Sequence, residues 1–285
     1  MALNIKGVNT GVIRQGNAFV ALALKIKEPK NKESLFFFPA LVLRDLFIAL
    51  ESRLAALHQL QGDDRQKYEK ARDKTAKKML ESVPALQEDE LRHADVNYRI
   101  DGLELTHNGK DDLTIALKLH SGDNVELTIN ALQIDLLVKA IIHAINNAGM
   151  KELALRISSL LDFLPLYDAD CQEKGSLEYD FYDQAQWKHD LFSHYLAVLY
   201  RFTDKAGKEC FSGSIVKTRT PSGSKEAQAI SRRLLDFSPR LKKLAGTPCQ
   251  VYVRTLNANN GQQLTQEQCL RALYHLRVQS VKTPA

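Results

Sequence analysis

The sequence lacks most of the features that mark a metal-dependent or disulfide-rich protein. Its 285 residues contain one tryptophan, three methionines and four cysteines. No Cys-x-x-Cys pair occurs, and the cysteines are far apart, at Cys171, Cys210, Cys249 and Cys269. This spacing is typical of isolated reduced thiols rather than of a zinc site or a disulfide framework. We therefore expect no metal and no cofactor.

Long apolar runs are also missing. No stretch of about 18 uninterrupted apolar residues exists, so no membrane span is expected. The first residues, MALNIKGVNTG, have no charged start followed by an apolar run, as a signal peptide would. Hydrophobic content of 44% and charged content of 26% are ordinary for globular domains. These observations predict a cytoplasmic protein without membrane contact.

Recognisable catalytic motifs are absent as well. The chain has no P-loop, no G-x-G-x-x-G loop and no G-x-S-x-G elbow. Ser222-x-x-Lys225 matches the nucleophile motif of serine acyl-enzymes, but the Ser-Asp-Asn and Lys-Thr-Gly motifs of those enzymes do not occur. His189 and His194 are five residues apart, whereas a metal pair on a helix needs three or four. No catalytic residue can be named, so an enzyme is the least favoured class.

What is present is an alternation of strands and helices. Residues 4–14, 18–27 and 35–38 have strand patterns, and Pro39 is suited to begin a helix. A charged, solvated helix follows at about 64–82. Residues 96–107, 113–120 and 124–129 then form a second set of strands, followed by a helix that ends at Gly149. Apolar positions of the two sets correspond at offsets of 95, 93 and 91 residues. This predicts a duplicated β-β-β-α unit, although unrelated hairpins followed by helices share such spacing.

The rest of the chain predicts a smaller α+β part. Residues 151–165 have a helical pattern, and 166–183 are interpreted as an acidic loop. Strands are expected at 208–220 and 249–256, a helix or a strand near 189–202, and a turn at 257–261. The last helix has Thr265 and Gln268 in a capping-box pattern. We predict an α+β fold with a duplicated domain (1–150), a linking helix and acidic loop (151–190) and a basic α+β domain (191–285).

The most distinctive segment is the basic stretch, residues 217–243, KTRTPSGSKEAQAISRRLLDFSPRLKK. It holds eight basic residues against Glu226 and Asp236, a net +6, while the remainder of the +5 chain sums to −1. A turn of Pro, Ser and Gly precedes a predicted helix, whose N-terminus can hold a phosphate. The candidate phosphate or nucleic-acid ligands are Lys217, Arg219, Ser222, Ser224, Lys225, Arg232, Arg233, Lys242 and Lys243.

Two other interpretations of the basic stretch stay open. It can be a solvated helix with a serine N-cap and scattered salt bridges. The acidic segment, with Asp168 and Asp170, can also pair with it inside the molecule and leave it less available to a ligand.

Several segments resemble the uncharacterised enterobacterial YjeJ family, namely NIKGVNTGVIR, ESLFFFPALVLRDL, NNAGMKELALRISSLLDFLPLYDAD, KTRTPSGSKE and LAGTPCQVYVRTL. The resemblance covers nearly the whole chain and implies a soluble bacterial protein without an assigned activity. The strands-then-helix order is also similar to the single-strand nucleic-acid binders of the PUR-repeat and Whirly type. Those proteins need stacking aromatics on an open sheet, and the predicted polar faces are poor in them.

Two functions follow as expectations. The first is a non-enzymatic protein that binds nucleic acid or another phosphate-bearing ligand. The alternative is a protein-interaction or oligomeric scaffold, in which the basic stretch contacts an acidic protein surface. Phosphate binding predicts basic side chains that converge on one surface, and a scaffold predicts an exposed apolar patch.

Overall fold

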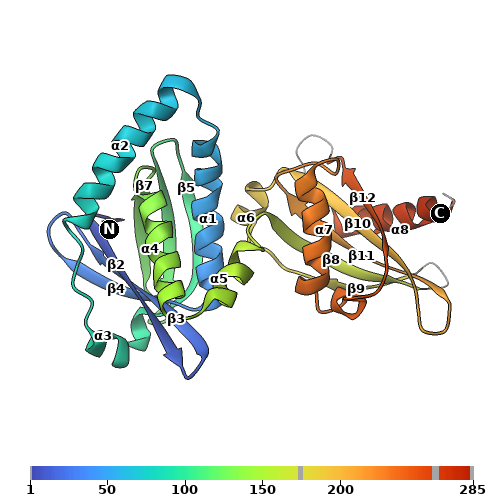
Figure 1. Cartoon of the computed structure of the whole chain (residues 1–285), viewed down its shortest axis with the longest axis horizontal. Coiled ribbons are helices and arrows are strands. Elements are labelled where there is room, and N and C mark those ends of the chain that lie inside the picture. Colours follow the sequence, from blue (N-terminus) through green and yellow to red (C-terminus); the bar gives the residue numbers. More distant parts are fainter. Residues whose placement is uncertain (1, 173–175, 259–262, 283–285) are drawn as a thin grey trace. The chain divides into compact units, whose positions relative to one another are not determined.

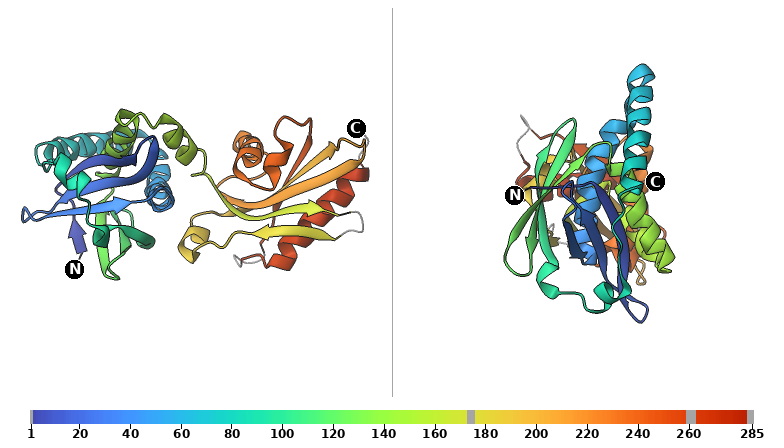
Figure 2. Two further views of the ribbon diagram at one scale, coloured as in Figure 1. Left: turned by 90° about the horizontal axis from the view of Figure 1, so that it is seen from below. Right: turned by 90° about the vertical axis from the view of Figure 1, so that its left-hand side faces the viewer.

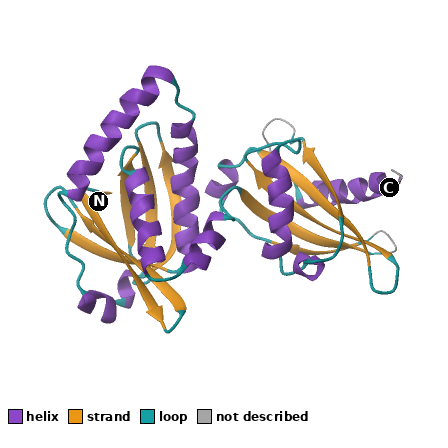
Figure 3. Ribbon diagram, in the orientation of Figure 1, coloured by secondary structure: helices purple, strands orange, loops and turns teal. Residues whose placement is uncertain are grey.

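The computed structural model describes residues 2–172, 176–258 and 263–282. The chain divides into two compact units, Met1–Leu161 and Asp162–Ala285. Each unit combines antiparallel strands with helices, as Figure 3 shows, so the predicted α+β class is confirmed. None of the helices in the described ranges is long and apolar enough to cross a bilayer.

The first unit begins with a short strand and a three-stranded sheet. β1 (Ala2–Asn4) is followed by β2 (Gly7–Gln15), β3 (Ala18–Lys27) and β4 (Glu33–Phe38), and β3 is the central strand of the β2-β3-β4 sheet. α1 (Ala40–His58) follows directly, with Pro39 as its N-cap residue. The apolar side chains of β3 from Ala21 onward and the three phenylalanines of β4 are buried in the core of the unit.

The alternating pattern of β3 is typical of a half-buried strand with one apolar face. In the structure both faces are covered, because Leu91 packs on the Ala21 and Ala23 face. Lys25 is buried on that face and its ammonium group binds Glu90 at 2.6 Å and Glu33 at 3.3 Å. The single charge that made this face look exposed is therefore paired inside the unit.

A four-stranded sheet completes the first unit. β5 (Ile100–Asn108), β6 (Asp112–Leu119) and β7 (Asn124–Asn130) are antiparallel, and β1 adds to β7 in parallel. α4 (Ile134–Asn147) follows and ends at Gly149, which has the predicted positive φ of 76°. α5 (Lys151–Ser158) is the last helix of this unit. The element order is thus β1, three further strands and α1, then three strands and α4. The origin of the two sets by duplication stays a prediction.

The connection between these two sets holds α2 (Gly62–Leu80), α3 (Glu88–Arg92) and the 3-10 turn η1 (Val96–Tyr98). α2 lies along the outside of the first unit (Figure 1). Only its Met79 is fully buried. The chain that leaves α2 approaches β2 so closely that a Cβ atom on Gly7 would lie 2.1 Å from the Ser82 carbonyl oxygen. A glycine at this position fixes where α2 ends.

The second unit is a five-stranded antiparallel sheet in the order β12-β10-β11-β8-β9. Its strands are β8 (Phe163–Cys171), β9 (Leu177–Phe181), β10 (His194–Thr203), β11 (Glu209–Thr218) and β12 (Gln250–Leu256). The short helix α6 (Gln186–Asp190) precedes β10. One face of the sheet carries α7 (Lys225–Phe237) and the turn η2 (Leu241–Leu244), and the other carries α8 (Gln266–Lys282) (Figure 2).

Two predictions for the middle of the chain were wrong. The helix expected over 151–165 ends at Ser158, and β8 begins at Phe163. The expected acidic loop over 166–183 instead contributes strands β8 and β9. The proposed linking segment, 151–190, is thereby shared between the two units. Residues 189–202 contain the β10 strand, and part of the expected turn at 257–261 lies outside the described residues.

Candidate nucleic-acid interface

The basic stretch begins on β11, where Lys217 is buried rather than exposed. Its ammonium group donates to the His189 carbonyl at 2.6 Å and lies 4.9 Å from the centre of the Tyr195 ring. Burial lowers the pKa of Lys217. Tyr195 and Lys217 are cross-strand partners on the face that α8 covers, opposite α7. Lys217 therefore does not share a surface with the cations of α7.

The next candidate ligands serve the fold locally. The Arg219 guanidinium lies 4.8 Å from the centre of the Phe192 ring. The backbone N–H and the hydroxyl of Ser222 both contact the Thr255 hydroxyl, at 2.8 and 2.9 Å. Ser224 is the N-cap of α7, and its Oγ accepts a hydrogen bond from the Ala227 N–H at 3.0 Å. The expected serine N-cap is confirmed, and this hydroxyl is already engaged.

Arg233 on α7 forms a two-point ion pair. Its Nη1 and Nη2 donate to the two carboxylate oxygens of Asp162 at 2.9 and 2.5 Å. The guanidinium also lies 5.8 Å from the centre of the Phe163 ring. Parallel donation of this kind is the strongest geometry for an arginine and a carboxylate. Arg233 thus holds α7 to the start of β8.

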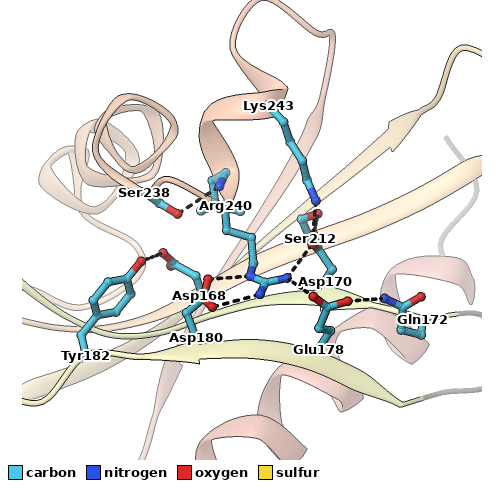
Figure 4. Close-up of polar contacts among 11 residues, drawn as sticks. Asp168, Asp170, Gln172, Glu178, Asp180, Tyr182, Ser212, Ser238, Arg240 and Lys243 are labelled. Atoms are coloured by element: carbon cyan, nitrogen blue, oxygen red, sulfur yellow. Dashed lines mark hydrogen bonds and ion pairs between the residues drawn. The ribbon is translucent and has the colours of Figure 1, made fainter.

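Arg240 is the centre of a larger charge cluster, drawn in Figure 4. It donates to Asp180 at 2.7 and 3.0 Å, to Asp170 at 2.9 Å and to Glu178 at 3.3 Å. Lys243 also binds Asp170, at 2.6 Å. The three carboxylates lie on β8 and β9, the strands that the sequence suggested were a loop. The basic stretch and the acidic segment therefore neutralise each other inside the second unit.

The electrostatics of this cluster follow from its geometry. Burial acts to raise the pKa of Asp170, but hydrogen bonds from Lys243, Ser212 and Arg240 outweigh it, and the pKa falls below its ordinary value. The hydrogen bonds from Arg240 lower the pKa of Asp180. Asp168 is fully buried on the same sheet face and accepts a hydrogen bond from the Tyr182 hydroxyl at 2.6 Å. Asp170 and Asp180 are thereby stabilised in their charged, hydrogen-bonding form.

Only a few candidate cations remain exposed. Lys225 and Arg232 lie on the outer face of α7, together with Asp236, and Lys242 lies on η2. Lys243 is half exposed but is paired with Asp170. The nine predicted ligands are thus not brought together on one surface, and two exposed acids, Glu226 and Asp236, accompany the two exposed cations of α7.

A stronger basic surface lies on α2 in the first unit. Tyr68, Thr75 and Met79 form the partly buried stripe that packs against the unit. At 100° per residue, five exposed lysines project from the side of the helix away from this stripe. We call this the lysine face; it consists of Lys67, Lys70, Lys74, Lys77 and Lys78.

The lysine face is largely free of neutralising partners. Lys67 lies 4.0 Å from Asp64, at the limit of an ion pair. Among the residues that the structure describes, the other four lysines have no ion pair within 4.0 Å. Two of the four acids of α2 are engaged with arginines: Glu69 binds Arg65 at 3.0 Å and Asp73 binds Arg72 at 2.9 Å. This separation of charge leaves the lysines available to an anion.

The sequence contained the signal for this face. Lysines at 67, 70, 74, 77 and 78 follow the i, i+3, i+4 spacing that places residues on one side of a helix. The acids in the same segment reduced the net charge and obscured the pattern, so the helix was interpreted as a solvated one.

The described strands of the four-stranded sheet offer no stacking platform of the PUR-repeat or Whirly type. The described strands β1, β5, β6 and β7 contain no Phe, Tyr or Trp. The side chains of the four-stranded sheet that alternate with its buried leucines and isoleucines include Thr114, Thr128, Glu126 and Glu104. Phe36, Phe37 and Phe38 of β4 are buried, as expected.

Neither metal ligands nor reactive thiols add a second kind of chemistry. Among the described residues, no three His, Cys, Asp or Glu side chains are grouped as metal ligands would be. All four cysteines are free. Burial raises the pKa of Cys171 and of Cys269 to about 11, which makes these thiols poor nucleophiles.

Fold and surface together define a two-unit α+β protein with an exposed basic helix. The model of the YjeJ-like family matches residues 1–283, and the chain belongs to this family. A relative described as "Uncharacterized protein YjeJ", from Escherichia coli (strain K12), is 65% identical over 285 residues, covering 100% of this chain and 99% of the relative. No solved structure matches the chain significantly.

Proposed function

We propose that this chain is a non-enzymatic nucleic-acid-binding protein that holds the phosphate backbone through the lysine face of α2. The observation that carries the proposal is the presence of five exposed lysines on one side of a helix, four of them without an ion pair to any residue in the described ranges. Exposed cations gain most from a polyanion, because each phosphate contact releases a condensed counterion. The basic stretch is a weaker candidate, since Lys217, Arg233, Arg240 and Lys243 are engaged within the second unit.

The test is fluorescence anisotropy of labelled nucleic acids, titrated at low and moderate salt. The variant Lys70→Gln/Lys74→Gln/Lys77→Gln removes three charges, and glutamine retains a helix propensity close to that of lysine. A matched control, Lys30→Gln/Lys110→Gln/Lys205→Gln, removes three exposed lysines outside the lysine face. Circular dichroism confirms that each variant is folded.

We expect the α2 variant to bind at least roughly tenfold more weakly. The slope of its log affinity against log salt concentration should be shallower by about 2 to 3. The control variant is expected to lose less affinity than the α2 variant. It should also keep most of the natural chain's dependence of affinity on salt. Absence of binding at low salt, or equal losses in both variants, would overturn the proposal. A third variant, Lys225→Gln/Arg232→Gln/Lys242→Gln, measures the share of the basic stretch, which we expect to be the smaller one.

A second candidate, an oligomeric scaffold, is favoured by one apolar groove. A groove of about 680 Å³ lies among α1, α4 and α5 of the first unit and is lined by Phe47, Val138, Ile142, Ile145 and Leu155. Leu155 is 69% exposed. A second copy of the chain is the simplest occupant, because most soluble oligomers are homo-oligomers. Light scattering would show a dimer that Leu155→Ser weakens; a monomer at all concentrations would exclude this role.

A further inference from the structure

The lysine face is arranged as two rows along α2. Lys70 and Lys77 are seven residues apart and nearly in line, about 10 Å along the helix axis. Lys67, Lys74 and Lys78 form the second row, which lies roughly 60–80° further around the helix. Together the rows cover about 16 Å of the helix axis. The face therefore presents charge in two lines on one side of the helix rather than in a single line.

Two rows suit a ligand with two backbones. An α-helix with its side chains is about 10–12 Å across, and the major groove of B-form DNA is about 12 Å wide. A helix in that groove has one phosphate backbone on each flank, so each lysine row meets one strand. A single strand offers one line of phosphates and would leave one of the rows without a partner.

The surroundings of the lysine face do not favour a single strand. Proteins that bind single strands stack the bases on aromatic side chains. The one aromatic residue of α2, Tyr68, lies on the packed stripe and not on the lysine face. The exposed side of α2 thus provides charge without a surface on which unpaired bases could stack.

The chemistry of the face also limits sequence readout. In the major groove Arg or Lys contacts guanine and Asn or Gln reads adenine by bidentate contacts, and lysine also meets phosphate as a point charge. The lysine face contains no Arg or Asn. A-form RNA has a deep, narrow major groove that does not admit a helix. The geometry accordingly separates the two kinds of duplex.

We propose that the ligand of the lysine face is B-form duplex DNA, bound through the phosphates of both strands without base recognition. This inference rests on the proposed function and names its substrate class. An acidic protein surface, the other ligand that a basic helix can meet, is an outcome of the test below.

The experiment compares three labelled probes of equal length, about two helical turns, at one salt concentration: duplex DNA, duplex RNA and single-stranded DNA. We expect duplex DNA to bind roughly tenfold more tightly than either of the others, and two unrelated duplex sequences to bind within about twofold. The row variants Lys70→Gln/Lys77→Gln and Lys67→Gln/Lys74→Gln/Lys78→Gln should each reduce the salt slope on duplex DNA, by about 2 and about 3.

The outcomes separate the two proposals. Single-stranded DNA or duplex RNA that binds as tightly as duplex DNA, with the same loss in the α2 variants, would overturn duplex recognition and leave nucleic-acid binding intact. A reduced salt slope in only one of the two row variants would also contradict a contact with both strands. No binding to any probe, together with capture of an acidic protein that depends on the same lysines, would overturn both.

Discussion

Arg240 binds Asp180 through two parallel hydrogen bonds, from Nε to Oδ2 at 2.7 Å and from Nη2 to Oδ1 at 3.0 Å. Arg240 belongs to the most basic stretch of the sequence, and Asp180 lies on β9 in the most acidic one. Asp170 and Glu178 complete the same cluster. The contact explains both the basic and the acidic segment of the sequence. The two segments pair with each other, so their charges largely neutralise each other within the second unit.

Removal of Arg240 should destabilise the second unit. The Arg240 side chain is 13% exposed and the Asp170 side chain 18%, so the pair is intermediate between a surface and a buried ion pair. We expect Arg240→Ala to lower the free energy of unfolding by about 2 kcal/mol. Urea denaturation followed by fluorescence of Trp187, the single tryptophan and a buried residue of this unit, measures the effect. Arg232→Ala, at an exposed position of the same stretch, should change stability by less than about 0.5 kcal/mol; equal effects would contradict the role of Arg240.

Acid should weaken the same cluster. The pKa of Asp170 is lowered in the folded unit, since hydrogen bonds from Lys243, Ser212 and Arg240 outweigh the effect of burial. A lowered folded pKa means that the unfolded chain binds the proton more tightly. The resulting stability is present above the unfolded pKa of about 3.9 and is lost as the pH falls through the folded pKa.

Asp170→Asn tests this pH dependence. We expect the variant to be less stable at pH 7 and to lose less stability than the natural chain between about pH 5 and pH 3. The measurement is the urea midpoint from Trp187 fluorescence at several pH values. Asp236→Asn, an exposed carboxylate on α7, is the control. Parallel pH profiles for Asp170→Asn and the natural chain would show that Asp170 does not contribute.

Local sequence rules predicted the elements whose partners are local. Pro39 precedes α1, and Gly149 ends α4 at a positive φ. The Thr265 and Gln268 side chains form the expected reciprocal capping contacts, at 3.3 and 2.8 Å. Each feature depends on residues within a few positions of one another, so the sequence pattern contains the whole interaction.

Non-local pairing explains what the sequence could not show. Strands β8 and β9 carry Asp170, Glu178 and Asp180, which are acceptable in a packed sheet because Arg240 reaches them from about sixty residues downstream. Lys217 is likewise buried because His189 and Tyr195 surround it. Charge counts along the chain cannot distinguish such cations from free ones. The lysine face differs, since the spacing that defines it lies within one helix, but the acids of the same segment obscured it.

Ser224 distinguishes a structural cap from a phosphate ligand. Its Oγ accepts the Ala227 N–H at 3.0 Å, so Ser224→Ala should cost about 1 kcal/mol of stability. Aspartate is an equally good N-cap, and Ser224→Asp should retain most of the stability. The added negative charge would nevertheless weaken phosphate binding at this helix end. We expect both variants to bind duplex DNA as the natural chain does; a loss confined to Ser224→Asp would indicate that the N-terminus of α7 contacts phosphate.

Gly7 connects the packing of β2 to the lysine face. A Cβ atom at this position would lie 2.1 Å from the carbonyl oxygen of Ser82, a backbone atom that cannot move without displacing the end of α2. We expect Gly7→Ala to reduce stability by about 2 kcal/mol or more and to speed tryptic cleavage at the α2 lysines. Gly102→Ala is the control, because nothing lies within 4 Å of its Cβ position.

The consequence for binding follows from the same contact. Lysines on a loosened helix pay more conformational entropy when they engage phosphate, so Gly7→Ala should weaken duplex DNA binding although it removes no charge. Its salt slope should stay that of the natural chain, since all five lysines remain. A variant that is cleaved faster within α2 yet binds DNA with unchanged affinity would show that the lysine face works without a fixed helix. The two-row contact with a duplex would then lose its geometric basis.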